Sequence, residues 1–171
     1  MKKFLCALFC LLLLCGCGIN KTKDVEKEPL NISGFNTCVY TTLNGIRVSA
    51  EADYTAFDSL VLTFTEPESV KGVQVACADG EYTLKTKNLT LSLSKGKLPY
   101  NMIFCALESC IENVNGTTPE KTEDSESLSY SYESHGHFCT LLVNPDTKEF
   151  EKLIIDGADA AVFENFAYKT Q

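Results

Sequence analysis

Three residues in the last quarter of the chain have types and a spacing that could support chemistry: His135, His137 and Cys139. On an unbroken strand the side chains of alternate residues share one face, and imidazole with thiolate is a ligand set for zinc or copper. Gly136 separates the two histidines, and a turn at this glycine would splay them. Because structural zinc sites need four ligands and no fourth stands nearby, we interpret the histidines as exposed turn residues and Cys139 as a core residue. We therefore expect no metal and no cofactor.

The sequence also contains no motif that is typical of nucleophilic catalysis. A cysteine nucleophile needs a base close in space, and Cys139 is the nearest candidate, without a local motif around it. The chain contains neither a Gly-x-Ser-x-Gly elbow nor a glycine-rich phosphate loop. Glu51 and Asp53 fall on the polar face of a predicted strand, where carboxylates are usually solvated. The sequence therefore predicts a protein that is not an enzyme.

One cysteine at the start of the chain suggests a different chemistry, the attachment of lipid. Two lysines precede an apolar run from Phe4 to Leu14, which closes on Leu14-Cys15-Gly16-Cys17. This is the order of a secretory signal, and its last four residues resemble a bacterial lipoprotein signal. The resemblance implies acyl chains on Cys17 and a lipid-anchored place on the extracytoplasmic face of a cell membrane. At about 1.5 Å per residue the run spans roughly half of a ~30 Å hydrocarbon core, so a spanning helix is not predicted.

Length and charge set the domain organisation and exclude some partners. We divide the chain into a signal peptide (1–16), a polar tether (17–34) and one domain (35–171). The formal net charge is −8, and no basic stripe is present. Such a chain is a poor ligand for nucleic acid and for anionic head groups. Membrane contact is therefore expected through the acyl chains on Cys17, and the sequence names no protein partner.

Alternation of apolar and polar residues predicts strands along most of the domain. Asn44-Gly45 is a strong hairpin signal, and the residues from Ile46 to Thr55 that follow it alternate strictly between apolar and polar. Further turn signals stand at Asp79-Gly80 and at Asn144–Thr147. In all we expect about ten antiparallel strands.

A single helix is predicted from Tyr100 to Val114, after the sixth strand. Its apolar residues recur at the spacing of one helical stripe, and Asn115-Gly116 ends it. The cysteines beyond Cys17 match no disulfide framework and no zinc pattern, so we interpret most of them as core side chains and leave their disulfide state open. They are Cys38, Cys77, Cys105, Cys110 and Cys139.

The order of several short motifs resembles a group of small lipoproteins from clostridial-type bacteria. The segment Thr63-Phe64-Thr65-Glu66-Pro67-Glu68-Ser69-Val70-Lys71-Gly72 carries the resemblance, followed by Asp79-Gly80, Leu89–Leu93, Leu98-Pro99 and Asn144–Thr147. In strand and helix order this group is similar to the LolA-type lipoprotein-carrier superfamily. The resemblance implies a mainly β (α+β) fold: a curved antiparallel sheet, or half-barrel, with one helix packed on its concave face.

The half-barrel resemblance further implies a hydrophobic cavity between sheet and helix. We expect a membrane-anchored extracytoplasmic lipoprotein that binds a lipid or another apolar ligand there. The expected lining residues are Leu62, Phe64, Val75, Leu84, Leu91, Phe104 and Leu107. The alternative is a non-catalytic envelope lipoprotein with a filled core and an interaction or structural role. It would meet its partner through an exposed strand or the acidic loop 117–127.

Overall fold

The computed structural model describes residues 29–43, 45–55, 59–78, 81–94, 103–121 and 126–169. Several sequence predictions lie outside the described residues: the signal peptide, the lipidated Cys17, the Asp79-Gly80 turn and the Leu98-Pro99 motif.

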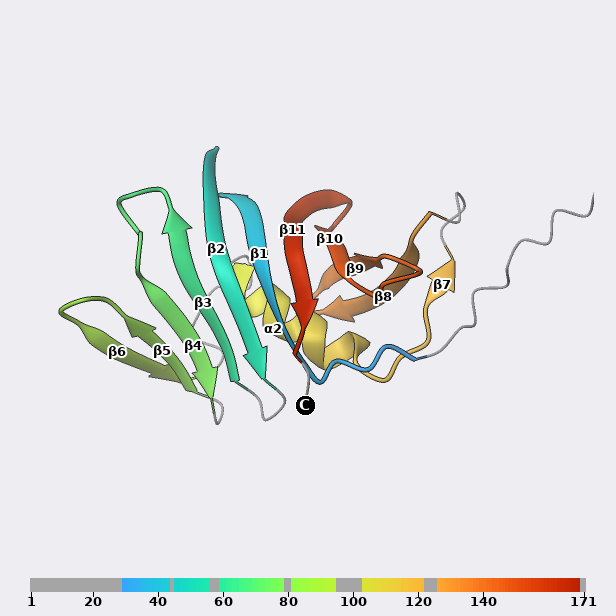
Figure 1. Cartoon of the computed structure of the whole chain (residues 1–171), viewed down its shortest axis with the longest axis horizontal. Helices are drawn as coiled ribbons and strands as arrows, with labels where there is room; N and C mark the ends of the chain where they lie inside the picture. The colour runs from blue at the N-terminus through green and yellow to red at the C-terminus, as the bar shows by residue number, and fades with distance from the viewer. Residues whose placement is uncertain are drawn as a thin grey trace, which may run out of the picture.

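Within these ranges the chain forms one antiparallel sheet and the helix α2 (Ile103–Val114), and α2 lies behind β1 and β11 in Figure 1. The strands are β1 (Gly34–Leu43), β2 (Ile46–Thr55), β3 (Ser59–Glu66), β4 (Gln74–Ala78), β5 (Glu81–Lys85), β6 (Thr90–Ser94), β7 (Glu120–Lys121), β8 (Leu128–Ser134), β9 (His137–Val143), β10 (Phe150–Ile155) and β11 (Ala158–Tyr168).

The sheet consists of two meanders, one from β1 to β6 and one from β7 to β11, and they are joined where β1 pairs with β11. Its order is β6-β5-β4-β3-β2-β1-β11-β10-β9-β8-β7, so β1 pairs with β11 at the centre while β6 and β7 stand at opposite edges. The chain must therefore pass from one edge of the sheet to the other between β6 and β7. The helix α2 lies on this crossing, which places it across one face of the sheet (Figure 1).

The helix is enclosed on most of its sides. All of its residues except Glu108, Glu112 and Asn113 are buried. A helix resting on a flat surface buries one stripe, whereas a helix that is apolar nearly all round lies inside a core. The curved sheet therefore wraps α2, and the concave face of the half-barrel is the face that holds the helix.

Bulges and an aromatic cluster shape the C-terminal half of this trough. In the β1–β11 pairing the step from Asn36 to Cys38 faces the longer step from Ala167 to Glu164, so β11 holds an extra residue. β10 holds another between Phe150 and Lys152, and such bulges increase local twist and bend a strand. On the concave side the ring of Phe35 lies 5.2 Å from that of Phe150 and 5.0 Å from that of Phe166. Because Phe35 is fully buried, this cluster fixes the β1–β11 junction.

The segment before β1 is already part of the packed domain. Leu30 and Ile32 are buried, and the backbone of Leu30 exchanges hydrogen bonds with residues just past α2: its N–H donates to Thr117 O (3.1 Å) and its carbonyl accepts from Gly116 N (2.7 Å). The Asn115 side chain accepts from the N–H of Ile32 at 2.9 Å. Packing thus begins five residues before the predicted domain start at 35, because two apolar side chains close the end of the helix.

The predicted fold class is confirmed: the chain is a mainly β, half-barrel α+β protein with a helix after the sixth strand. One strand was not expected. The two residues of β7 lie in the predicted acidic loop and pair with Ser129 and Leu128 of β8. The turn predicted at Gly136 is present, since both His135 (φ 54) and Gly136 (φ 80) have left-handed backbone conformations between β8 and β9.

Candidate functional site

Four of the seven residues expected to line a cavity lie instead in the packed core. The exposed fraction of the residue is 0% for Leu62, 2% for Val75, 1% for Phe104 and 0% for Leu107. Phe64 and Leu84 are partly buried and pack against the same cluster. At this end of the trough the sheet and α2 are in direct contact, so these six residues hold the helix onto the sheet.

The seventh residue, Leu91, is separated from this core. It lies on β6 opposite Leu84 of β5, and 46% of it is exposed. Its neighbours Leu89 and Leu93 on the same face are also exposed. Beyond β5 the concave face of the sheet thus continues as an apolar surface that α2 does not cover.

A cavity of about 240 Å³ opens elsewhere, at the N-terminal end of α2. Four strand ends meet the first turns of the helix there: the end of β1, the start of β9, the end of β10 and the start of β11. Its apolar lining is supplied by Ile103 and Ala106 from the helix and by Ile155, Ala158 and Ala160 from the strands. Polar groups join them from Thr41, Thr42, His137, Asp156 and Asp159. A concave, mainly apolar site with a few polar groups is the usual form of a small-molecule pocket.

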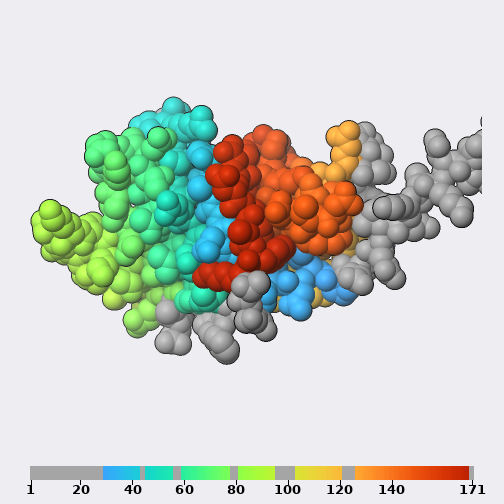
Figure 2. Space-filling view, viewed as in Figure 1, coloured from blue at the N-terminus to red at the C-terminus, as the bar shows by residue number. Residues whose placement is uncertain are grey.

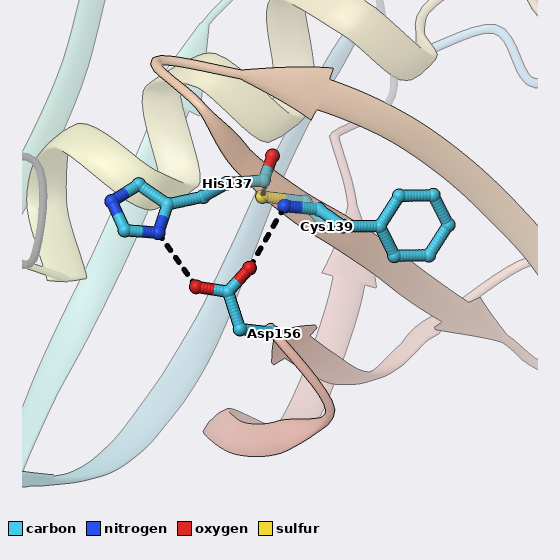
Figure 3. Close-up of polar contacts among 4 residues, drawn as sticks. His137, Cys139 and Asp156 are labelled. Atoms are coloured by element: carbon cyan, nitrogen blue, oxygen red, sulfur yellow. Dashed lines mark hydrogen bonds and ion pairs between the residues drawn. The ribbon is translucent and has the colours of Figure 1, made fainter.

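The polar side of this cavity contains an ordered His–Asp pair (Figure 3). Nδ1 of His137 lies 2.7 Å from Oδ2 of Asp156, and the amide of Phe138 donates to Oδ1 of the same carboxylate at 3.0 Å. An ionised carboxylate only accepts hydrogen bonds, so Nδ1 of His137 carries the proton. These two donors, the imidazole first, hold the pKa of Asp156 below its usual value.

The contribution of the His137–Asp156 pair to the stability of the fold should depend on pH. Since the folded-state pKa of Asp156 is depressed, its carboxylate stabilises the fold above the unfolded-state pKa of about 3.9, and this contribution is lost as the pH falls through the lower folded value. Asp156→Ala should therefore be less stable than the wild type at pH 6, and the difference should shrink in acid. Urea unfolding at stepped pH measures this, and a difference that is constant down to pH ~2 would contradict it.

A second hollow faces the cavity from the outer surface of the sheet, the side that Figure 2 shows in space-filling form. Its volume is about 360 Å³, and Thr41, Thr42, Asp159 and Ala160 line both spaces. The paired register of β1 and β11 ends at Tyr40 and Val162, after which the Thr41 hydroxyl donates to the carbonyl of Ala160 at 2.6 Å. The two hollows thus flank the place where the central strands separate.

A polar cluster stands between α2 and the N-terminal meander. The carboxylate of Glu108 accepts from the thiol of Cys77 at 3.0 Å and from the hydroxyl of Tyr82 at 2.5 Å. Burial, with the hydrogen bond to Glu108, raises the pKa of Tyr82 far above its usual value, which keeps the phenol as a donor. The space beside Glu108 is small, about 30 Å³, so this cluster ties the helix to β4 and β5 and offers no room for a substrate.

The described part of the chain contains five cysteines, most of them buried. Cys38, Cys77, Cys105, Cys110 and Cys139 are reduced thiols outside any disulfide. Burial raises the pKa of Cys110 to about 12, which suppresses the reactive thiolate. Cys139 is fully buried, and its thiol donates weakly to the backbone carbonyl of His137 at 3.8 Å. Among the described residues, no three side chains of metal-binding type converge on one point.

Comparison with known proteins yields similarity in structure alone. No protein-family model and no curated protein matches the sequence. An uncharacterised conserved protein from Thermus thermophilus has a similar structure, with a TM-score of 0.51 at 11% identity over 81% of this chain and 80% of that one. A LolA superfamily protein from Nitrosomonas europaea aligns with a TM-score of 0.43 at 9% identity over 86% of this chain and 90% of that one. The first similarity shows a shared fold.

The helical part of the described chain is short. Within the described ranges, no helix combines the length and the apolar character needed to span a bilayer.

Proposed function

We propose that this chain is a non-catalytic, lipid-anchored extracytoplasmic protein that binds an apolar ligand in the cavity at the N-terminal end of α2. The cavity itself carries the proposal: about 240 Å³ of space with Ile103, Ala106 and Ile155 among its walls. Its position differs from the one expected from sequence. The ligand would occupy the end of the trough, where the strands separate, and not the packed contact between Leu62 and Phe104.

The anchor would keep this site close to the membrane. Leu30, where packing begins, stands thirteen residues after the proposed lipidated Cys17. A fully extended chain of that length reaches about 45 Å, so the domain would stay within roughly one domain diameter of the bilayer. A binding protein held at that distance can take up lipid-like molecules from the membrane surface without diffusing away.

Filling the cavity should abolish binding. Ala158 is an exposed residue at the start of β11 that lines the cavity, so Ala158→Phe places a ring in the ligand's space. We expect the affinity for N-phenyl-1-naphthylamine, a neutral apolar dye, to fall about ten-fold or more, which corresponds to about 1.4 kcal/mol. Fluorescence titration of the chain from residue 18 onward measures this, because that fragment keeps Leu30 and Ile32.

The matched control is Ala167→Phe, the same substitution at an exposed position of the same strand that does not line the cavity. It should bind the dye like the wild type. Native mass spectrometry beside the denatured mass provides a second readout, since a retained apolar ligand adds mass that disappears on denaturation. Equal affinities for the two variants would refute this site, and a bare native mass without dye binding would refute apolar binding altogether.

The second candidate function is that of an interaction or structural lipoprotein. The observation that favours it is the uncovered apolar surface at β6, where Leu91 and Leu93 of the strand are exposed together with Leu89, the residue before it.

A further inference from the structure

The edge strand β6 carries no charged residue, no proline and no bulge, the features that often prevent edge-to-edge pairing. All five of its residues are exposed, and among the described strands it pairs with β5 alone. Natural edge strands are commonly protected by lysine, proline, inward charges or a bulge. Thr90–Ser94 contains none of these residues, and its pairing with β5 is regular along its length. In Figure 1 this strand stands at the end of the sheet opposite β7.

The register shows which backbone groups of β6 point outward. The amide of Thr86 donates to the carbonyl of Leu89, so residues 86 and 89 form a hydrogen-bonded pair. Such pairs alternate along an antiparallel ladder, which makes Leu84–Leu91 and Tyr82–Leu93 hydrogen-bonded pairs as well. The N–H and C=O groups of the intervening residues therefore face the free edge; these are Thr90, Ser92 and Ser94.

We propose that this edge binds a second copy of the chain, with two β6 strands pairing antiparallel about a twofold axis at Ser92. In this register Ser92 faces its own copy and Thr90 faces Ser94. All three outward-facing residues then form hydrogen-bonded pairs, which no shifted antiparallel register achieves. The interface is isologous, as a closed dimer requires. The proposal does not depend on the apolar ligand.

Side chains on both faces agree with this register. On the concave face Leu91 of one copy meets Leu93 of the other, so exposed leucines cover each other. On the outer face Glu81 stands in the row of Ser94, and Lys85 stands in the row of Thr90. The twofold axis therefore places Glu81 of each copy in line with Lys85 of the other, three strand spacings away.

Charge selects the second copy as the occupant. The whole chain carries −8, so two copies repel unless they meet at a neutral or complementary surface. Residues 88–94 carry no charged side chain, so the paired segment Thr90–Ser94 brings no charges together across the twofold axis. On the neighbouring strand β5, Glu81 and Lys85 have opposite signs.

Cysteine trapping in the full-length chain tests the proposed register. Ser92→Cys would place two thiols on residues whose Cα atoms are about 5.5 Å apart, inside the range for a disulfide. We expect copper-phenanthroline oxidation of membranes to give a covalent dimer, with a 92–92 disulfide identified by peptide mass spectrometry. The matched control is Thr83→Cys, on the same face but one strand inward; its Cα would lie about 14 Å from its copy, too far to link.

One further variant distinguishes the proposed dimer from random collision. Adding Leu91→Lys to Ser92→Cys puts a charge into the apolar contact and should lower the linked fraction about ten-fold. Circular dichroism of each variant monitors folding.

A linked fraction for Ser92→Cys no higher than that for Thr83→Cys would overturn the proposal. So would a 92–92 disulfide that Leu91→Lys leaves unchanged. If the thiol introduced by Ser92→Cys instead links to another protein of the membrane, the edge binds a different partner and the second copy is excluded as its occupant.

Discussion

Phe104→Ala is expected to lower the free energy of unfolding by about 3–5 kcal/mol, the cost of removing a buried aromatic side chain. Phe104 is 1% exposed, and its ring contacts that of Tyr82 edge-on, with centroids 5.4 Å apart. If this position lined an empty ligand cavity, truncation would lose few contacts and would cost much less. Urea unfolding of the chain from residue 18 onward, without added ligand, measures the difference.

Leu91→Ala is the matched comparison, because the sequence assigned Phe104 and Leu91 to the same cavity wall. Leu91 is 46% exposed, so its truncation should change the stability by no more than about 0.5 kcal/mol. A small loss for Phe104→Ala would mean that α2 does not pack tightly on β5. In that case the predicted cavity between sheet and helix would be restored as the leading ligand site.

The helix and most strands could be predicted because their signals are local. The apolar stripe of α2 runs from Ile103 to Val114, and Asn115-Gly116 follows it directly, so neighbouring residues determine both its existence and its end. The same holds for the alternation in β2 and for the turn at Asn144, whose side chain accepts hydrogen bonds from the amides of Asp146 and Thr147.

The cavity could not be predicted because it depends on contacts between distant segments. Thr41, Ile103, His137 and Ala158 meet only after β1 has paired with β11 and α2 has crossed the sheet. Of these four residues, the sequence suggested a functional role for His137 alone, as a possible metal ligand. The predicted ends of the strands could have indicated the cavity, because its lining residues lie at the ends of four strands.

Leu91 and Leu62 show the limit of the alternation pattern itself. Both belong to apolar residues of period two, and both point to the concave face. Alternation identifies the face of a strand, but it does not show how far a helix extends over that face. Leu62 is fully buried in the core, whereas β6 lies beyond the core, and the same pattern therefore leads to opposite exposures. The resemblance to clostridial-type lipoproteins stays a prediction.

Glu108→Ala should be strongly destabilising although the residue is polar. The variant leaves the hydroxyl of Tyr82 and the thiol of Cys77 without their carboxylate acceptor, and an unsatisfied buried donor costs about 1–3 kcal/mol.

Tyr82→Phe removes one hydrogen bond to a charged group, and we expect it to lower the free energy of unfolding by about 1.5–3 kcal/mol. Urea unfolding at neutral pH measures both effects.

The double variant Glu108→Ala/Tyr82→Phe separates the hydrogen bond from general damage to the helix. Once the phenol is gone, removing the carboxylate no longer strands that donor, so the combined loss should be smaller than the sum by about 0.5–3 kcal/mol. Strict additivity would show that the 2.5 Å contact contributes nothing to stability. A coupling of the expected size would identify the Glu108–Tyr82 bond as a specific link between α2 and β5, which orients the helix inside an otherwise non-directional apolar core.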